Sequence, residues 1–492
     1  MPAPELDSSG QASDRGVDAA VGRAAARCLW AAQAWIDGRW QDAVRLDIDT
    51  SGRWAAITPD VHAVPAHATV VDGALLPGLV DAHSHAFQRA FAGLAERIGA
   101  NPDGSADDFW SWRDRMYGVA LRITPEQLRA VAAQLYVELV RGGYTQVCEF
   151  HYLQHAEDGR PYGDPATLAW SLADAGQEAG IGLTILPVLY ERAGFDAPTL
   201  RADQRRFAST PERVDALHRA IAAAPRPLVN AGVAIHSLRA ASPQSIAALL
   251  ERVGDAALPI HVHIAEQTRE VDDCVATTGL RPIEWLLREV RVDARWQLVH
   301  ATHATPHEID ATAASGAGIV LCPSTEANLG DGLADLPRWL DSGVPVTIGS
   351  DSQVSRQWPE ELRWLEYGQR LTRRQRNVAA GPKLHRGATA ANLFERVLVG
   401  SGPNAGFASW GLVPGARADA LVVDLKAPGV LGVPASHRLD ALVFATDAPP
   451  FSAVYVGGRP VIHNGRHVQQ VNVEERFTAA MAALWSETDR LG

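Results

Sequence analysis

Two residue types with distinctive chemistry are scarce in this chain. Lysine occurs only at Lys383 and Lys426, so arginine carries nearly all of the positive charge. Cysteine is also rare, and the four cysteines lie far apart without a Cys-x-x-Cys pair, at Cys28, Cys148, Cys274 and Cys322. This spacing excludes a disulfide framework and is typical of proteins from a reducing compartment.

Long hydrophobic runs and an excess of positive charge are absent as well. No apolar run approaches the ~20 residues of a membrane-spanning helix, and the first residues lack the basic segment and apolar core of a secretory signal. The net charge is −12, whereas nucleic acids and anionic membranes require a basic surface. We therefore expect a cytoplasmic protein without nucleic-acid or membrane partners, in which an anionic substrate would depend on local arginines.

The remaining composition is that of a large globular protein. The 492 residues are 47% hydrophobic and 21% charged, as in ordinary soluble domains. A chain of this length exceeds what one hydrophobic core usually holds, so we expect a large catalytic domain and a smaller one.

Predicted strands alternate with predicted helices through the middle of the chain. The strands lie at about 75–80, 144–150, 181–189, 228–235, 258–264, 296–300, 318–322 and 344–348. The helices include 124–141, 166–179, 211–224 and 243–253. This alternation predicts an α/β fold, a (β/α)8 barrel of the TIM type, with a doubly wound open sheet as the alternative.

Capping residues support these helix boundaries. Thr124 and Ser242 each precede a proline, the pattern of an N-cap followed by proline in the first helical turn. The pair Gly142-Gly143, together with Gly180 and Gly254, follows predicted helices, where glycine suits a left-handed C-cap.

Both flanks of the barrel region contain short predicted strands joined by tight turns. Similar hairpin turns occur at Asp37-Gly38-Arg39 and Gly457-Gly458-Arg459. We expect residues 26–76 and 405–475 to form one small β-sandwich domain beside a catalytic barrel at 77–404. Residues 1–25, rich in serine, glycine, aspartate and alanine, are predicted to be a mobile lead-in. Residues 476–492 are predicted to form a C-terminal helix.

His83 and His85 follow directly on the first predicted strand. Alternate residues of a strand point to the same face, so both imidazoles would project together. Imidazole is the commonest protein ligand of catalytic zinc. The spacing alone is weak evidence, and its weight depends on ligands from other strand ends.

Such residues occur where later strands end. His263 and Glu266 follow the fifth predicted strand, His300 the sixth and Asp351 the eighth. In a (β/α)8 barrel these ends converge on the active site, and three imidazoles with one carboxylate would leave zinc an open position. Taken singly, Asp351 fits a helix N-cap. His261, one layer deeper than His263, is expected to pack inside the barrel, and His151 and His155 could be loop residues.

The segment from Pro77 to His85 resembles the Pro-Gly-Leu-Val-Asp-x-His-x-His motif of the amidohydrolase superfamily. The resemblance covers nearly the whole chain. It implies that His83, His85, His263 and Asp351 bind the metal, and that His300 orients the attacking water or the substrate.

The resemblance also implies one metal ion. Superfamily members with two ions bridge them through a carboxylated lysine or a carboxylate at the fourth strand. Here no lysine precedes Lys383, and the segment Val233–His236 contains no acid. We therefore expect one Zn²⁺ per chain, with Fe²⁺ as the alternative.

Glu266, three residues beyond His263, resembles the acid of the single-metal subgroup, which consists largely of deaminases and deiminases. In that chemistry zinc lowers the pKa of its water to ~7. Asp351 would accept the proton of the attacking hydroxide, and Glu266 would deliver a proton to the departing nitrogen. A solvated loop acid is the alternative for Glu266.

Further segments resemble the deiminases of this superfamily that convert N-formimino-L-glutamate to N-formyl-L-glutamate and ammonia in histidine degradation. These segments are 83–89, 92–96, 109–113, 149–152, 236–239 and 324–329. The resemblance implies a homodimer with a small anionic amidine as substrate, held by Gln88, Arg113, Tyr152, His236 and Arg239. Two guanidinium groups suit a substrate with two carboxylates.

Two other functions remain open at this point. A single-metal deaminase of guanine or a related heterocycle would need a flat aromatic slot with amide contacts in place of two arginines. A non-catalytic scaffold with the same fold would be expected to have lost a ligand or the acid, and none is missing here.

Overall fold

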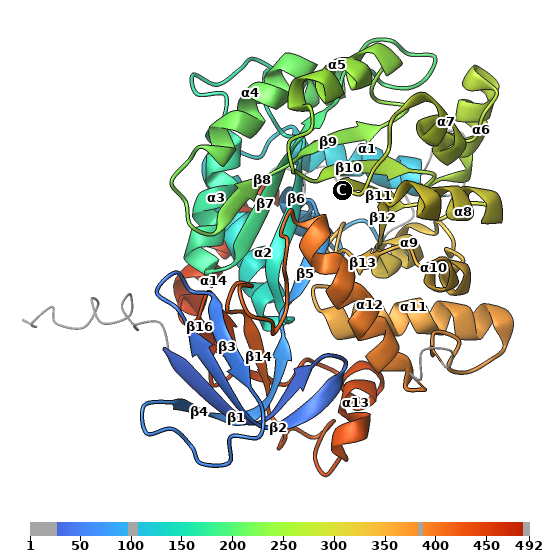
Figure 1. Ribbon diagram of the computed structural model, residues 1–492. Coiled ribbons are helices and arrows are strands. Elements are labelled where there is room, and N and C mark those ends of the chain that lie inside the picture. The colour runs from blue at the N-terminus through green and yellow to red at the C-terminus, as the bar shows by residue number, and fades with distance from the viewer. Residues whose placement is uncertain (1–26, 97–106, 382–386, 486–492) are drawn as a thin grey trace, which may run out of the picture.

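The computed structural model describes residues 27–96, 107–381 and 387–485. It consists of a parallel barrel and a separate sheet built from both flanks of the chain (Figure 1). The predicted lead-in at 1–25 lies outside the described residues. No helix among the described residues is long and apolar enough to cross a membrane.

The barrel is nearly closed, and its strands run parallel. In chain order its strands are β5 (Leu79–Ser84), β6 (Tyr144–His151), β7 (Gly182–Leu189), β8 (Val229–Ala231), β9 (Val233–Ser237), β10 (Ile260–Ile264), β11 (Trp296–His300), β12 (Gly318–Leu321) and β13 (Val346–Ile348). They follow one another around the barrel from β5 to β13, with β8 pairing only with β7. A parallel bridge between Ser84 and Asp351 joins the first strand to the end of the last. The predicted (β/α)8 architecture is thus confirmed.

Two predicted strands are divided differently in the structure. Residues 75–77 belong to the separate sheet rather than to the first barrel strand, because Leu75 and Leu76 pair antiparallel with a strand from the other flank. The barrel strand begins at Leu79, after the break at Gly78. The predicted strand 228–235 is interrupted at Gly232 and forms β8 and β9.

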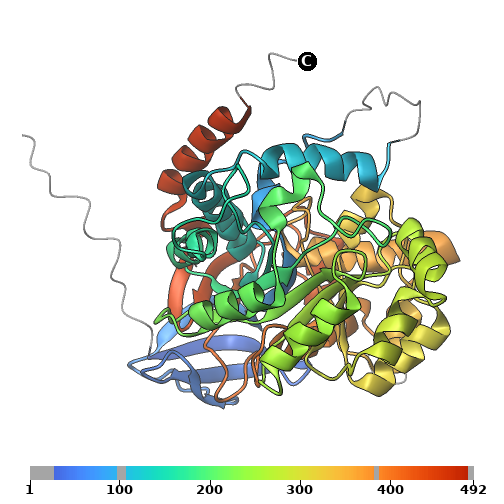
Figure 2. The same cartoon turned by 90° about the horizontal axis from the view of Figure 1, so that it is seen from above.

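Helices surround the barrel and extend beyond it (Figures 1 and 2). They are α1 (Phe109–Ala120), α2 (Pro125–Arg141), α3 (Thr167–Ala179), α4 (Pro211–Ala222), α5 (Pro243–Val253), α6 (Thr268–Thr278), α7 (Pro282–Glu289), α8 (Pro306–Ser315), α9 (Pro323–Leu329), α10 (Leu336–Ser342), α11 (Trp358–Arg373), α12 (Thr389–Asn404), α13 (Arg438–Phe444) and α14 (Gln470–Trp485). Short 3₁₀ helices lie at η1 (Ala86–Ala90), η2 (Ala202–Phe207) and η4 (Ala435–His437).

The predicted helix caps are largely present. The Thr124 side chain accepts a hydrogen bond from the Gln127 amide, and Gly180 ends α3 in the left-handed conformation. Gly142 is different, because its φ is −75°. A Cβ there would lie 1.9 Å from the Arg356 carbonyl oxygen, so close packing rather than backbone conformation requires glycine.

The flanks of the chain build one eight-stranded sheet. Its strands, in spatial order, are β17 (Arg466–His467), β16 (Arg459–His463), β15 (Phe451–Val456), β14 (Ala420–Val423), β4 (Thr69–Pro77), β1 (Cys28–Ile36), β2 (Arg39–Ile48) and β3 (Trp54–Thr58). The join between the flanks is the antiparallel pair β4–β14. Leu46, Trp54, Leu75 and Val422 share one small hydrophobic core, to which strands from both flanks contribute.

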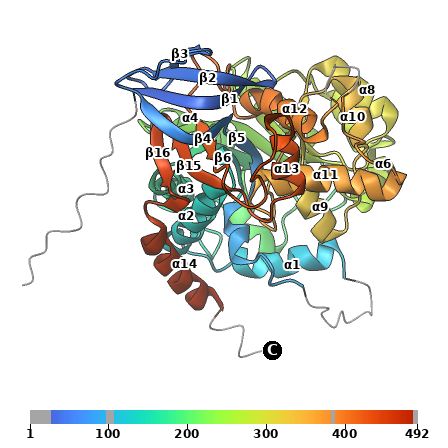
Figure 3. The same ribbon diagram turned by 90° about the horizontal axis from the view of Figure 1, so that it is seen from below.

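Two helices fall differently from the sequence-based boundaries. α13 interrupts the region expected to be strands, and α14 begins at Gln470 rather than at 476. Residues 486–492 lie outside the described part of the chain. α14 packs beside α2, while α1 lies on the side of the barrel away from β1–β3 (Figure 3).

The barrel interior is polar at its deeper level, toward the amino ends of the strands. We call the group Cys148, His261, Gln297, Thr347 and Asn404 the barrel floor. The Asn404 side chain, at the end of α12, donates to Gln297 Oε1 at 3.2 Å and to Thr347 Oγ1 at 3.1 Å. Its Oδ1 lies 3.3 Å from the sulfur of Cys148, and its carbonyl accepts from His261 Nε2 at 3.0 Å. His261 therefore packs inside the barrel, as expected.

Candidate active site

The carboxyl ends of the barrel strands, which we call the barrel mouth, bring His83 and Asp351 together through the backbone. The Asp351 amide donates to the His83 carbonyl at 2.9 Å. Gly349, two residues before Asp351, lies so close to the first strand that a Cβ on it would sit 2.7 Å from the Cβ of His83. Barrel closure thus fixes the distance between the first-strand histidines and the eighth-strand carboxylate.

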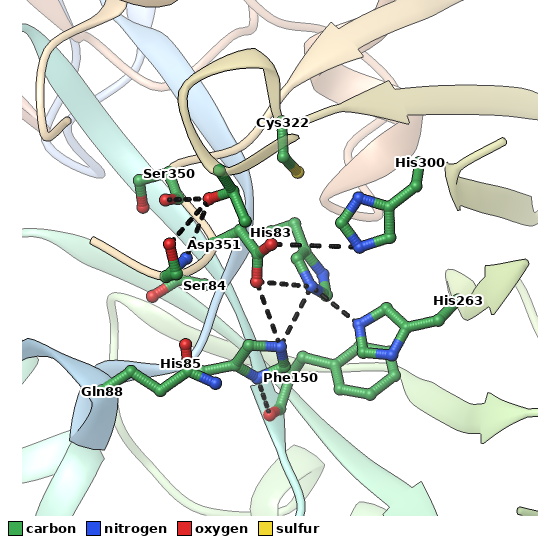
Figure 4. A network of polar contacts seen from close by, with 12 residues as sticks. His83, Ser84, His85, Gln88, Phe150, His263, His300, Cys322, Ser350 and Asp351 are labelled. Atoms are coloured by element: carbon green, nitrogen blue, oxygen red, sulfur yellow. Dashed lines mark hydrogen bonds and ion pairs between the residues drawn. The ribbon is translucent and has the colours of Figure 1, made fainter. Parts of the chain in front are cut away.

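Three imidazoles converge at this point with their Nε2 atoms facing one another (Figure 4). His83 Nε2 lies 3.1 Å from His85 Nε2 and 2.9 Å from His263 Nε2. Asp351 Oδ1 lies 3.5 Å from His83 Nε2 and 3.4 Å from His85 Nε2. All four side chains are buried.

The protonation of this cluster suits metal binding. His85 Nδ1 lies 3.0 Å from the carbonyl oxygen of Phe150, which can only accept. The ring proton therefore sits on Nδ1, and the Nε2 lone pair points into the cluster. Burial lowers the pKa of His83 to about 4 and that of His85 to about 3, so both rings are neutral at pH 7.

The distances also suit a tetrahedral ion. Zinc–nitrogen bonds of about 2.0–2.1 Å place neighbouring ligands of a tetrahedron about 3.3 Å apart. The separations of 2.9–3.5 Å among His83, His85, His263 and Asp351 lie around this value. Three nitrogens and one carboxylate oxygen are ligands that zinc accepts. The Phe150 ring stacks on the His263 ring with 4.3 Å between centroids, which holds this imidazole in place. These residues fit a single divalent ion.

His300 and Glu266 lie beside the same cluster. His300 Nε2 is 3.8 Å from Glu266 Oε1 and 3.9 Å from Asp351 Oδ2. Burial lowers the pKa of His300, but the carboxylates of Glu266, Glu326 and Asp351 outweigh it and raise the pKa. Burial raises the pKa of Glu266 against the opposing effect of His300. The carboxyl of Glu266 and the imidazole of His300 therefore both bind a proton more tightly than they would in water.

Backbone strain is concentrated at the same strand ends. Ala265, His300 and Asp351 have φ values of 51°, 71° and 46°, the left-handed region that non-glycine residues rarely adopt. Such conformations cost of order 1–3 kcal/mol each and persist where the fold holds side chains in a required direction. These three residues lie at or just beyond the ends of β10, β11 and β13, where Glu266, His300 and Asp351 are placed.

Glu326 contacts His300 from the opposite side and had no role assigned from the sequence. Its Oε1 lies 3.5 Å from His300 Nδ1 and accepts a hydrogen bond from the Cys322 amide at 3.0 Å. It belongs to the segment 324–329 that supported the resemblance. Its place directly after a barrel strand, at the start of α9, was the available signal.

A pocket opens above the cluster and contains most of the remaining predicted residues. Its lining includes Gln88, Arg113, Tyr152, His236, Arg239, His263, Glu266, His300 and Asp351. His83 is fully buried beneath it. The structure therefore gathers every residue named from the sequence as a site candidate around one cavity.

The two arginines carry polar atoms without a partner. Arg113 Nε and Arg239 Nη1 are buried and have no hydrogen-bond partner among the described residues. Gln88 Nε2 donates to the Tyr152 hydroxyl at 3.2 Å, and the Gln88 Oε1 atom is likewise buried and unpartnered. Buried polar groups are normally hydrogen-bonded, so these free donors and this acceptor point to a polar ligand that supplies the missing partners.

Aromatic side chains complete the pocket, and sequence reasoning gave them no role. Phe109, Trp112 and Tyr117 come from α1, and Tyr190 follows β7. The Tyr190 ring lies 4.3 Å from the His236 ring, and its hydroxyl accepts from Gln204 of η2 at 2.9 Å. These contacts depend on segments far apart in the chain, so no local pattern could have indicated them.

The chain is similar to several known proteins. The amidohydrolase family model matches residues 74–461. The chain is 44% identical over 460 residues to a formimidoylglutamate deiminase from Pseudomonas aeruginosa, covering 93% of this chain and 99% of that protein. It is 30% identical over 393 residues to a 5-methylthioadenosine/S-adenosylhomocysteine deaminase from Natronomonas pharaonis, covering 79% and 81% of the two chains.

A solved structure shows the same architecture. The crystal structure of an amidohydrolase from Brucella melitensis superposes with a TM-score of 0.86 at 40% identity, over 93% of this chain and 99% of that one. The family match covers the barrel, the histidine cluster, the end of β4 and most of the strands from the C-terminal flank. This chain belongs to the amidohydrolase family.

Proposed function

We propose that this enzyme hydrolyses the formimino group of N-formimino-L-glutamate, giving N-formyl-L-glutamate and ammonia. The observation that carries the proposal is one pocket that combines a metal-type ligand cluster with two unpartnered arginines. The 44% identity to a formimidoylglutamate deiminase supports the same substrate. The step would belong to histidine degradation and take place in the cytoplasm.

His83, His85, His263 and Asp351 would hold one Zn²⁺, with Fe²⁺ as the alternative. Zinc supplies a Lewis acid that lowers the pKa of its water to ~7, so that hydroxide is available at neutral pH. The described residues offer one such cluster at the barrel mouth, because both candidate ligand groups there share His83. This sharing supports one ion per chain.

The chain's own groups would move the protons. Asp351 Oδ2 would accept the proton released when water attacks the formimino carbon, and His300 Nε2, 3.9 Å away, would stabilise this carboxylate. Glu266, whose pKa burial raises, can deliver a proton to the nitrogen that leaves. The carbon gains a bond to oxygen, its bond to the terminal nitrogen breaks, and ammonia departs.

Arg113 and Arg239 would bind the two carboxylates of the substrate. A planar guanidinium holds a carboxylate through paired charge-assisted hydrogen bonds. Gln88, Tyr152 and His236 line the space between these arginines and the histidine cluster and would orient the formimino end. Substrate binding would thus satisfy the unpartnered atoms of Gln88, Arg113 and Arg239.

The aromatic lining and the 30% identity to a nucleoside deaminase favour a heterocycle deaminase as the second candidate. Purified metal-loaded enzyme should be offered N-formimino-L-glutamate, guanine and 5-methylthioadenosine at equal concentration. We expect ammonia release from the formimino substrate at a kcat/KM at least ~100-fold above that for either heterocycle. Faster turnover of a heterocycle would overturn the proposal in favour of the second candidate.

A further inference from the structure

One indole side chain stands among three guanidinium groups at the pocket. The Trp110 ring centroid lies 4.6 Å from Arg113 Cζ, 5.2 Å from Arg239 Cζ and 5.0 Å from Arg269 Cζ. All three separations fall within the ~6 Å range of cation–π attraction. The ring is half-buried, and none of the assigned binding roles includes it.

The backbone fixes the position of this indole. Trp110 lies in the first turn of α1, and the Asp108 side chain accepts hydrogen bonds from the Trp110 and Ser111 amides. The other end of α1 is anchored by the fully buried Arg206, which donates to the carbonyls of Ala120 and Ile123. The ring is therefore presented by a helix held at both ends.

The arginines that contact the Trp110 ring have few polar partners, and two of them also lie over a second ring: Arg113 over Tyr117 at 5.5 Å and Arg239 over Phe109 at 5.7 Å. Arg239 is buried, and the described residues provide no ion pair within 4 Å of it. Arg113 has a 3.4 Å contact with Asp114, a carboxylate that also binds Arg201 at 2.9 Å. Arg269 is exposed and lies 3.7 Å from Asp273. Aromatic faces are therefore the main contacts of the Arg239 guanidinium, and for Arg113 they supplement a carboxylate that it shares with Arg201.

We propose that Trp110 is a positioning residue for dicarboxylate recognition, because its indole holds the guanidiniums of Arg113 and Arg239 with their free donors available to the substrate. This inference rests on the proposed function, since it assigns the two arginines to the two carboxylates. Aromatic partners suit this task. They attract each cation without occupying its hydrogen-bond donors, whereas a carboxylate partner would compete with the substrate.

The test is Trp110→Leu, with Trp110→Phe as the conservative variant. Loss of two desolvated cation–π contacts should raise KM for N-formimino-L-glutamate about 10- to 30-fold, with kcat changed less than about threefold. Phenylalanine should restore most of the affinity. For a formimino compound with a single carboxylate, the KM penalty should be clearly smaller than for the dicarboxylate.

Trp170→Leu is the matched control. Trp170 is a half-buried tryptophan on α3 that contacts Arg226 at 5.3 Å, remote from the pocket lining. The Trp170→Leu substitution should leave KM for N-formimino-L-glutamate unchanged within about twofold. Calorimetric binding of glutarate to wild type and variants supplies a readout independent of turnover, and Trp110→Leu should weaken it by the same factor as KM.

An equal loss on dicarboxylate and monocarboxylate compounds, with a lowered melting temperature, would reduce Trp110 to structural support. Unchanged glutarate affinity in Trp110→Leu would also overturn the inference. Failure of the proposed function looks different, because wild type itself would then release no ammonia from N-formimino-L-glutamate. The dependence of glutarate binding on Trp110 could still be measured in that case.

Discussion

Two histidines of one strand show how the barrel floor and the barrel mouth differ. His261 and His263 both belong to β10, are two residues apart and are buried. His261 Nε2 donates to the Asn404 carbonyl, a group that can only accept. His263 Nε2 instead faces His83 Nε2 at 2.9 Å, and the His83 Nε2 atom also faces His85 Nε2.

The difference is one of complementary partners. At the floor, Asn404 donates to Gln297 and Thr347 and accepts from His261 Nε2, so donors there meet acceptors, although His261 Nδ1 has no partner among the described residues. At the mouth, the Nε2 atoms of three imidazoles face one another and a carboxylate, and the nearby arginines have free donors. Because buried polar groups are normally paired, this mismatch marks the mouth as the part of the barrel that requires a cation and a polar ligand.

The largest expected effect comes from substituting His263 and His261, one at a time. His263→Ala should lose the metal and lower kcat/KM by about 1,000-fold or more, because water without the ion returns from a pKa of about 7 toward 15.7. His261→Leu should keep the metal and stay within about threefold of wild-type turnover. This substitution should cost about 1–3 kcal/mol of stability, since the Asn404 carbonyl loses its hydrogen bond from His261 and keeps only the Cys148 thiol at 3.7 Å. Elemental analysis and ammonia release on both variants provide the comparison.

Equal metal loss in the two variants would contradict the distinction between floor and mouth. Full metal retention in His263→Ala would show that His263 is not a ligand. Thermal unfolding curves for both proteins separate metal loss from loss of folding.

The acid at the mouth gives the next effect. Glu266→Gln preserves size and hydrogen-bonding capacity but removes the proton that the leaving nitrogen would take. We expect turnover to fall ~100-fold or more with metal content unchanged, the scale of a lost general acid–base group. Asp351→Asn should reduce both turnover and metal content. Normal turnover by metal-loaded Glu266→Gln would refute the role assigned to this carboxyl.

Substituting the two arginines with free donors at the mouth should have a somewhat smaller effect on turnover. Replacing Arg113 or Arg239 by methionine should lower kcat/KM for the dicarboxylate by about 30- to 150-fold, or about 2–3 kcal/mol of transition-state binding. Lysine should rescue each position only in part, because a point charge cannot form the paired bonds of a guanidinium.

Truncated substrates sharpen this prediction. A formimino compound lacking one carboxylate should be poor for wild type, and the matching methionine variant should lose less from that truncation. Strict additivity of enzyme and substrate truncations for both arginines would argue against direct contact.

The smallest effect concerns a buried carboxyl that is satisfied by the protein. Glu361 accepts from the Ser324 amide at 3.0 Å and from its hydroxyl at 2.6 Å. Burial outweighs these bonds and raises its pKa to about 8. The folded state therefore favours the protonated carboxyl. The contribution of Glu361 to the free energy of unfolding is present at low pH and is lost as pH rises from about 4.5 through 8.

As pH rises from 5 to 9, the free energy of unfolding should therefore fall in both proteins, but by about 1–3 kcal/mol less in Glu361→Gln than in wild type. Turnover should change little, because Glu361 does not line the pocket. Melting temperatures across this range test the difference, with the neighbouring Glu360→Gln as control. Parallel pH profiles for wild type and Glu361→Gln would show that the carboxyl does not titrate as described.

Residues whose position follows from one strand could be predicted from the sequence. His83, His85, His263, His300 and Asp351 end strands that hydrophobic patterning locates, and parallel barrel strands bring their carboxyl ends together. The convergence follows from the fold, so it required no knowledge of the packing. The eight-stranded barrel and the sheet from both flanks were predictable for similar reasons of alternation and turn chemistry.

Other features depend on packing between distant segments. The break after Pro77 arises because Leu75 and Leu76 pair with β14, more than 300 residues later. The contact of Glu326 with His300 depends on the ring orientation, and Trp110 meets Arg239 and Arg269 only because α1 lies over the pocket. Local sequence patterns contain none of this information.

The central claim is that the unpaired imidazoles at the barrel mouth form one metal site. Elemental analysis of purified, active wild-type protein after exhaustive dialysis tests it most directly. We predict one tightly bound divalent ion per chain, zinc in preference to iron, and loss of ammonia release in proportion to its removal by chelation. Two firmly bound ions per active chain, or full activity in protein free of metal, would contradict the account.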